Sequence, residues 1–244
     1  MKGFDVSDFL ARLTNGFLLQ GAFVTVWLTA AALAGGFVLG LILALMRSSN
    51  VRACVAAARF YVWVFRGTPL LIQLIIIFTG LPQIGIRLGV TGSAVLGLVL
   101  HEAAYLSETV RGGFLSIGQG QWDAARALGL PRRIVLSHVI LPQAIRIMLP
   151  MLGNQVNGLL KATSITSVIS MQELMKNSEM LMQVNFDVLE VYAAAACYYL
   201  ALTTAWDAAQ SWMERKLGRA YLPASRSDRA IEISHSVMTR EITT

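Results

Sequence analysis

Residues 21–46 read GAFVTVWLTAAALAGGFVLGLILALM and contain no charged side chain. The run exceeds the roughly 20 apolar residues that a helix needs to cross the hydrocarbon core of a membrane. A cleaved signal peptide has a shorter apolar region, about 7 to 15 residues, after a basic start. Here the run is longer, and the leader before it mixes Asp5 and Asp8 with Arg12. The stretch therefore predicts a membrane-spanning helix that is retained in the protein.

The rest of the chain is also unusually apolar. Of its 244 residues, 55% are hydrophobic and 14% are charged, whereas about 25% of the residues of a soluble domain are charged. Four further apolar runs follow the first, at residues 60–80, 88–107, 145–160 and 188–206. We predict an all-α integral membrane bundle of five transmembrane helices over residues 16–221, with a leader at 1–15 and a mobile tail at 222–244.

The distribution of Lys and Arg predicts the orientation of this bundle, because the connections on the cytoplasmic side carry an excess of basic residues. Fifteen of the 20 basic residues lie in the connections after the first and third spans and in the tail: Arg47, Arg52, Arg59, Arg66, Arg111, Arg126, Arg132, Arg133, Arg146, Arg215, Lys216, Arg219, Arg226, Arg229 and Arg240. We therefore expect the N-terminus and the leader outside and the tail in the cytoplasm. The net charge of +6 follows from this bias, which favours a membrane protein over a nucleic-acid-binding one.

The stretch WDAARALGLPRRIVL, residues 122–136, interrupts the apolar pattern on the cytoplasmic side. We expect a short helix with Asp123 in its first turn and an end set by Gly129 and the following proline. Trp122, Ala125 and Leu128 recur at helical spacing and form a small apolar stripe. A helix of about two turns is marginal alone, so it must dock, either on its own spans or in a groove of a partner protein.

Asp123-Ala124-Ala125, followed by Gly129 and then by Val139-Ile140-Leu141-Pro142, resembles the EAA loop of membrane subunits of ATP-binding-cassette importers, E-A-A-x3-G-x9-I-x-L-P. Asp replaces Glu and Val replaces Ile. Several stretches resemble the branch that imports polar amino acids, the histidine, glutamine and glutamate type: FRGTPLLIQL (65–74), AAYLSETVRGG (103–113), GQGQWDAARALGL (118–130), ILPQAIRIMLP (140–150) and GNQVNGLLKATSI (153–165). The resemblance covers residues 16–220 and implies the type I importer permease fold.

The resemblance implies that the short helix is a coupling helix within a loop at about 116–142 and that it sits on a separate ATPase subunit, which binds ATP and Mg²⁺. The coupling residues are Trp122, Asp123, Ala124, Ala125, Gly129 and Pro142. It also implies a second membrane subunit, an external solute-binding protein and a bacterial cytoplasmic membrane. The chain itself is not expected to be an enzyme, because the nearest match to the P-loop pattern, Gly153 to Gly158, is followed by Leu159.

Polar residues inside the spans are candidates for the substrate path, since they are costly in lipid. They are His101, Glu102, Asn154, Asn157, Lys161, Thr163 and Ser164. Glu102 and Lys161 suit the ammonium and carboxylate groups of an amino acid. Alternatively, these groups join helices by hydrogen bonds or lie near the outer surface.

Three other features of the spans are assigned structural roles. We expect Glu108 and Arg111 to form a structural pair, and Arg66 to be a membrane-boundary anchor beside a kink at Pro69.

No metal site is expected, because Cys54 and Cys197 are far apart and lie in no ligand motif. A self-contained secondary transporter or channel is the alternative function, although its five predicted spans show no inverted repeat.

Overall fold

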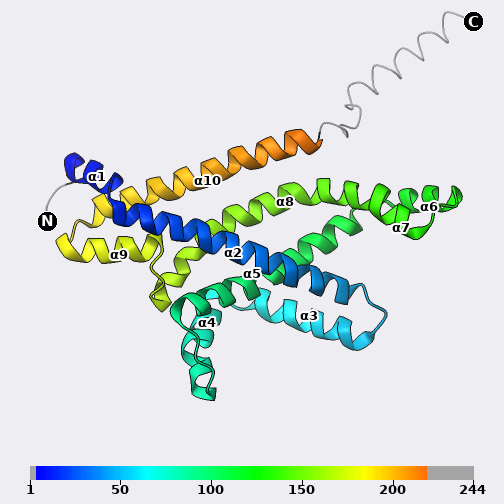
Figure 1. The fold of residues 1–244 in the computed structure, drawn as a ribbon, viewed down its shortest axis with the longest axis horizontal. Helices are drawn as coiled ribbons and strands as arrows, with labels where there is room; N and C mark the ends of the chain where they lie inside the picture. Colours follow the sequence, from blue (N-terminus) through cyan, green and yellow to red (C-terminus); the bar gives the residue numbers. More distant parts are fainter. Residues whose placement is uncertain (1–3, 219–244) are drawn as a thin grey trace, which may run out of the picture.

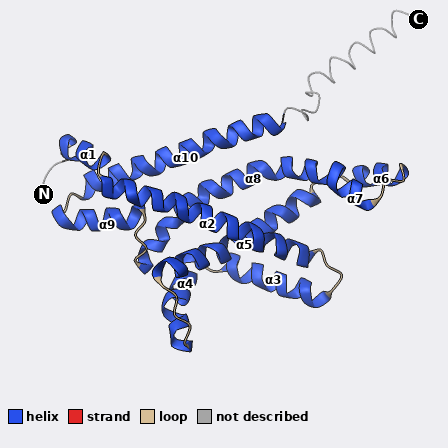
Figure 2. Cartoon of the chain, viewed as in Figure 1, coloured by secondary structure: helices blue, strands red, loops and turns tan. Residues whose placement is uncertain are grey.

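The computed structural model describes residues 4–218 as helices joined by short connections, with no strand in that range (Figures 1 and 2). The α-helices are α1 (Val6–Leu13), α2 (Gly16–Arg47), α3 (Arg52–Gly67), α4 (Leu70–Ile75), α5 (Val90–Leu115), α6 (Gln119–Ala127), α7 (Arg132–Ile134), α8 (Leu141–Ala162), α9 (Leu174–Asn185) and α10 (Val188–Gly218). Four further helical turns are η1 (Ile76–Gly80), η2 (Leu81–Ile84), η3 (Val135–Ile140) and η4 (Thr163–Ile169). The expected tail at 222–244 lies outside the described residues.

Four stretches are long and apolar enough to cross a membrane: Gly16–Arg47, Val90–Leu115, Arg132–Ile169 and Val188–Lys216. They correspond to the first, third, fourth and fifth spans expected from the sequence. The second expected span, 60–80, is not one straight helix, because α3 and the segment Leu70–Ile84 are bent by 106° at the break between them. The described residues thus hold four such helices, or five if the bent pair counts as one span.

Pro69 explains the break between α3 and α4. Proline disfavours helical geometry at the residue before it, and Thr68 is extended, with φ −118° and ψ 144°. The buried side chain of Gln73 occupies the break, where its amide nitrogen donates to the carbonyl oxygens of Phe65 and Thr68, each at 3.0 Å. Backbone groups at membrane depth must find partners within the protein. Gln73 therefore makes the bend a fixed feature, and Figure 1 shows α4 turning away from the long helices.

Helices α2 and α5 form the centre of the bundle and run in the same direction. Small residues allow their close approach, as in many membrane helix pairs. A Cβ atom added at Gly36 would lie 2.9 Å from Cβ of Glu102, and one added at Gly40 would lie 3.0 Å from the carbonyl oxygen of Ala103. The glycines of α2 thus set its distance to α5, and the spacing Gly36-x3-Gly40 is the sequence signal for this pairing.

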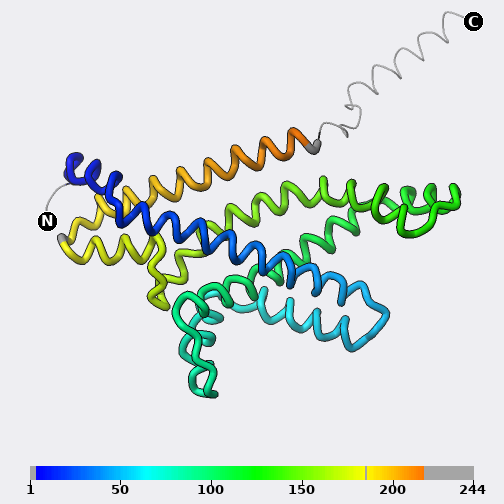
Figure 3. The backbone as a smooth tube through the Cα atoms, viewed as in Figure 1, coloured from blue at the N-terminus to red at the C-terminus, as the bar shows by residue number. Residues whose placement is uncertain are grey.

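The two ends of the bundle are built differently. Helices α1 and α9 lie at one end, where Arg12 pairs with Asp187 at 2.9 Å and the Asn177 side chain donates to the carbonyl of Phe17 at 2.7 Å. Glu173 is fully buried there and accepts from the first amides of α9. Helices α6 and α7 lie at the opposite end (Figure 3). The expected leader therefore includes a helix, α1, that packs against α10.

Candidate coupling site

Helix α6 starts earlier than the sequence indicated. It begins at Gln119, with the amide of Gln121 donating to the carbonyl of Gly118 at 3.0 Å. Asp123 therefore lies in the middle of the helix, and the expectation that it occupies the first turn is wrong. Its carboxylate accepts from Gln119 at 3.3 Å and lies 3.6 Å from the guanidinium of Arg126. These exposed contacts between neighbouring turns replace the expected contact with the helix dipole.

The end of α6 agrees with the sequence. Gly129 adopts a left-handed conformation with φ +65°. The amide of Gly129 donates to the carbonyl of Arg126 at 2.9 Å, and the amide of Leu130 donates to that of Ala125 at 3.2 Å. This pair of bonds is the Schellman ending, in which glycine is the preferred residue. The expected stop at Gly129, with proline shortly after it, is confirmed.

Helix α6 has one face on its own bundle and another face that is free. Ala125 is 4% exposed, and with Trp122 it packs against buried residues of α5 and α8, among them Val110 and Ala144. Leu128 is 76% exposed, so the expected stripe of Trp122, Ala125 and Leu128 does not face one way. The free face presents Asp123, Ala124, Leu128 and Gly129, all exposed.

Two contacts join α6 to the long helix that follows it. The side chain of Gln143, in the first turn of α8, donates to that of Gln121 at 3.2 Å. Pro142 is half-buried beside it, where α8 begins after the π-helical turn η3. Of the six coupling residues expected, Asp123, Ala124 and Gly129 lie on the free face of α6, whereas Trp122, Ala125 and Pro142 attach the loop to the bundle.

The polar residues of α5 lie inside the bundle. Glu102 is 2% exposed and is hydrogen-bonded to Gln155 of α8, while its Oε1 has no partner among the described residues. His101 is half-buried, with Nδ1 lying 3.1 Å from the side-chain oxygen of Gln73. Its ring also lies 5.0 Å from that of Tyr105. His101 therefore joins α5 to the break between α3 and α4.

The polar residues of α8 and η4 lie mainly towards α10. Asn157 donates to Asp207 at 2.7 Å, and Thr163 is fully buried and donates to the carbonyl of Leu160 at 2.8 Å. Lys161 and Ser164 line a hollow of about 430 Å³ beside α10. Asn154 is exposed. The residues expected along the substrate path thus belong to separate groups of contacts, one towards the break between α3 and α4 and another towards α10.

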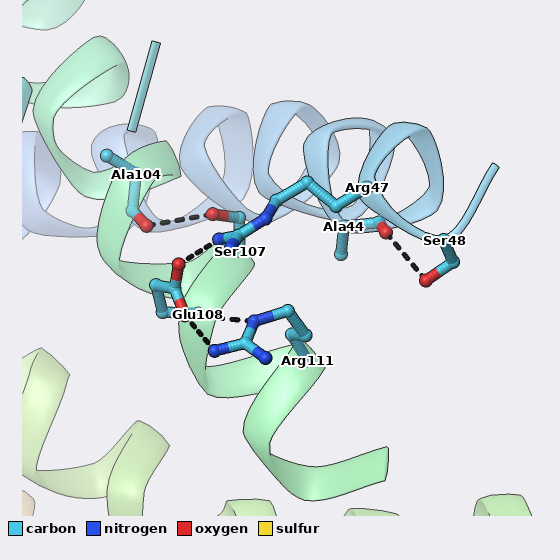
Figure 4. Close-up of polar contacts among 7 residues, drawn as sticks. All are labelled: Ala44, Arg47, Ser48, Ala104, Ser107, Glu108 and Arg111. Carbon is cyan, nitrogen blue, oxygen red and sulfur yellow. Dashed lines mark hydrogen bonds and ion pairs between the residues drawn. The ribbon is translucent and has the colours of Figure 1, made fainter. Parts of the chain in front are cut away.

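A cluster of charges joins α2 to α5 at the α6 end (Figure 4). Glu108 pairs with Arg47 of α2 on one side and with Arg111, at 2.8 Å, on the other. The expected pair of Glu108 and Arg111 is present, and Arg47 is an addition that sequence spacing could not show. Arg66 lies with its guanidinium 5.3 Å from the centre of the Tyr105 ring and forms no ion pair within residues 4–218.

The chain was compared with known proteins. A family model described as the inner membrane component of binding-protein-dependent transport systems matches residues 36–219. The chain is 34% identical over 203 residues to a probable glutamine ABC transporter permease of Bacillus subtilis, covering 83% of this chain and 94% of the relative. It is 36% identical over 202 residues to the glutamine transport system permease of Escherichia coli K12, covering 82% and 92%.

A solved structure shows the same fold. A crystal structure of an amino acid ABC transporter with histidines superposes with a TM-score of 0.83 at 32% identity, covering 88% of this chain and all of the matched chain. The loop that contains α6 also carries the motif typical of such permeases, and its residues Asp123, Ala124 and Gly129 lie on the free face. The chain therefore belongs to the family of inner-membrane components of binding-protein-dependent transport systems, the permease subunits of ATP-binding-cassette transporters.

Proposed function

We propose that this chain is the membrane-spanning subunit of an ATP-driven importer of polar amino acids, and that α6 couples it to a separate ATPase subunit. The observation that carries this proposal is that α6 packs on its own bundle with one face and leaves its other face exposed. Trp122 and Ala125 fix the helix to its own bundle, while Asp123, Ala124 and Leu128 remain exposed. Both dockings considered from the sequence can therefore occur together, one on each face of the helix.

This arrangement allows α6 to transmit force. A partner that grips the free face moves α6, and the movement passes to α5 and α8 through their shared apolar contacts and through the Gln121–Gln143 bond. Alternating access then follows from rocking of the bundle as a rigid body. ATP and Mg²⁺ bind to the ATPase subunit. A second membrane subunit, a copy or a relative, completes the path, and an external solute-binding protein delivers the amino acid.

The proposed orientation places the N-terminus outside a bacterial cytoplasmic membrane and the C-terminus in the cytoplasm. The positions of the charges support it. Arg47, Arg111, Arg132 and Arg133 gather at the α6 end, which is the distribution expected of a cytoplasmic surface. Helix α6 then faces the compartment in which ATP is found.

We propose that the substrate path includes one face of α5 together with Arg66. His101, Tyr105 and Glu108 are spaced by about one turn and are all half-buried. The guanidinium of Arg66 lies over the ring of Tyr105, which is about one turn of α5, roughly 5 Å, further from the α6 end than Glu108. An arginine at that depth avoids lipid and faces a partner or an aqueous path, so Arg66 suits the carboxylate of an amino acid.

The remaining expected residues have different parts in this proposal. Lys161 and Ser164 remain candidates at the hollow beside α10, and Asn154 remains one because it is exposed. Glu102 and Asn157 hold helices together through the hydrogen bonds described above, whereas Thr163 is buried and bonds within its own helical segment. This assignment agrees with the alternative that polar groups in membrane bundles bond across helices.

Copurification tests the coupling role. Leu128→Asp places a charge at the centre of the free face, so we expect the ATPase subunit to be lost from the detergent-extracted complex. Val184→Asp, at an exposed position on α9, is the matched control, and the ATPase subunit should remain bound to it. Membrane insertion of both variants is checked by their yield in the membrane fraction.

Two results would contradict the proposal. One is full retention of the ATPase subunit by Leu128→Asp, together with normal ATP-driven uptake. The other is uptake that persists when ATP hydrolysis is abolished and follows a proton or sodium gradient, which would indicate a secondary transporter.

A further inference from the structure

A half-open cavity of about 740 Å³ lies at the α6 end of the bundle. Its wall is mainly apolar and comes from three long segments, with Leu41 and Leu45 of α2, Val110 and Phe114 of α5, and Leu136 and Leu141 at the start of the third. Trp122, on the inner face of α6, completes it. The free face of α6 does not take part, so a partner bound to that face leaves the cavity open.

The mouth of this cavity is strongly basic. Arg111, Arg132 and Arg133 all line it. Glu108 is the carboxylate paired with Arg111, and Arg47 shares it. Arg132 and Arg133 are exposed and form no ion pair within the described part of the chain. Three arginines thus line the cavity, and only Arg111 among them has a carboxylate partner, so the cavity has an excess of positive charge that an anion would balance.

The depth of the cavity matches the boundary between hydrocarbon and headgroups. The uncharged run of α2 ends at Met46, directly before Arg47. Leu41 and Leu45 therefore lie within the last turns of the apolar region, while the arginines lie where that region ends. An apolar wall in the hydrocarbon with basic residues at its edge matches the two parts of a phospholipid, an acyl chain and a phosphate.

We propose that this cavity binds one anionic phospholipid of the cytoplasmic leaflet, with the phosphate on Arg132 and Arg133 and an acyl chain along Leu41 and Phe114. The assignment to that leaflet rests on the orientation given under the proposed function. A soluble anion would gain nothing from the long apolar wall. Because Trp122 forms part of the site, the lipid braces the inner face of the coupling helix against the bundle.

Lipid copurification tests the site. The transporter, assembled with its membrane and ATPase subunits, is equilibrated in detergent with equal amounts of phosphatidylglycerol and phosphatidylcholine, and the lipid retained per permease is measured by mass spectrometry. Wild type should retain phosphatidylglycerol preferentially. Arg132→Gln combined with Arg133→Gln should weaken that retention about 30-fold, as expected from about 1 kcal/mol for each basic residue near an anionic lipid.

Two further variants separate charge at this site from charge in general. Arg52→Gln combined with Arg59→Gln removes two exposed arginines of α3 that do not line the cavity, and it should retain phosphatidylglycerol as wild type does. Leu41→Trp places a bulky ring in the proposed path of the acyl chain but leaves every arginine in place, and it should weaken lipid retention. An excess of inorganic phosphate should displace little lipid, because phosphate has no acyl chain.

Several outcomes overturn the proposal. They are equal retention of the two lipids, equal loss from both arginine pairs, displacement by millimolar phosphate, or crosslinking of a cysteine at Leu136 to a partner subunit in place of lipid retention. Each of these leaves the ATPase subunit bound in the same preparation, so failure of the lipid site is distinct from failure of the coupling role.

Discussion

Gly129 illustrates how much a single residue decides at the coupling site. Its φ of +65° lies in the left-handed region, where a side chain costs about 1–2 kcal/mol. The space around it is open, so the requirement for glycine comes from the backbone and not from packing. The same residue ends α6 and thereby sets the direction of the chain towards α8.

We expect Gly129→Ala to shift the local equilibrium towards an unwound end of α6 by about five- to 30-fold. ATP-driven uptake in proteoliposomes should fall, and hydrogen exchange at residues 125–130 should rise. Gly120→Ala is the matched control, because Gly120 is helical with open space around it and alanine favours a helix. Uptake by Gly129→Ala equal to that of the control would exclude this role for the left-handed residue.

Arg66 lies in the proposed substrate path, with its guanidinium over the ring of Tyr105. Charge-assisted hydrogen bonds contribute about 1.5–3 kcal/mol, so Arg66→Gln should slow ATP-driven amino acid uptake about tenfold or more while the ATPase subunit stays bound. Arg59→Gln, on the same helix but with no ring contact, should transport normally. Normal uptake by Arg66→Gln would remove Arg66 from the proposed path.

At the scale of elements, the bent pair α3–α4 differs most from a simple membrane helix. A buried glutamine, Gln73, satisfies the carbonyls that Pro69 leaves free and also contacts His101 of α5. The bend is therefore held from two sides, by hydrogen bonds across the break and by the neighbouring helix. The chain therefore turns by 106° between α3 and the segment after it, while the carbonyls of Phe65 and Thr68 keep a hydrogen-bond donor.

We expect Gln73→Ala to destabilise the protein by about 2 kcal/mol, because it leaves the carbonyls of Phe65 and Thr68 without their donor. The measurement is the apparent Tm of the purified protein in detergent. Gln83→Ala, at an exposed position beyond the same bend, should stay within about 0.5 kcal/mol of wild type. Equal Tm values for the two variants would show that the break does not depend on Gln73.

At the scale of the whole molecule, the bundle has two chemically different ends. The α1–α9 end is closed by Arg12–Asp187 and by the buried cap of Glu173. The α6 end carries the arginine cluster around Glu108 and the free face of the coupling helix. An importer needs this asymmetry, because it receives a solute on one side of the membrane and contacts its ATPase on the other.

Labelling from the two sides of the membrane tests the orientation. With Cys54 and Cys197 replaced by serine, a single cysteine at Phe186, which is 79% exposed, should react with an impermeant maleimide in right-side-out vesicles. A single cysteine at Leu128 should react only in inside-out vesicles. The reverse pattern would exclude both the proposed topology and contact between α6 and a cytoplasmic ATPase.

The sequence by itself determined the class of the protein. The uncharged run 21–46 predicts a membrane span by its length alone, and the residues from Asp123 to Pro142 resemble the EAA loop of importer permeases. Gly129 and the proline after it defined the end of α6, because left-handed backbone and proline act locally. Such features depend on neighbouring residues and on the solvent, so they can be read in a linear chain.

The tertiary structure decided which residues meet. Sequence spacing could not show that Arg47 joins the Glu108–Arg111 pair, that Trp122 turns inward while Leu128 turns outward, or that Gln73 fills the break at Pro69. The sequence contains the pattern Gly36-x3-Gly40, but only the structure shows that these two glycines pack against α5. Contacts between distant residues depend on how helices approach and rotate, and these are settled by packing of the whole bundle.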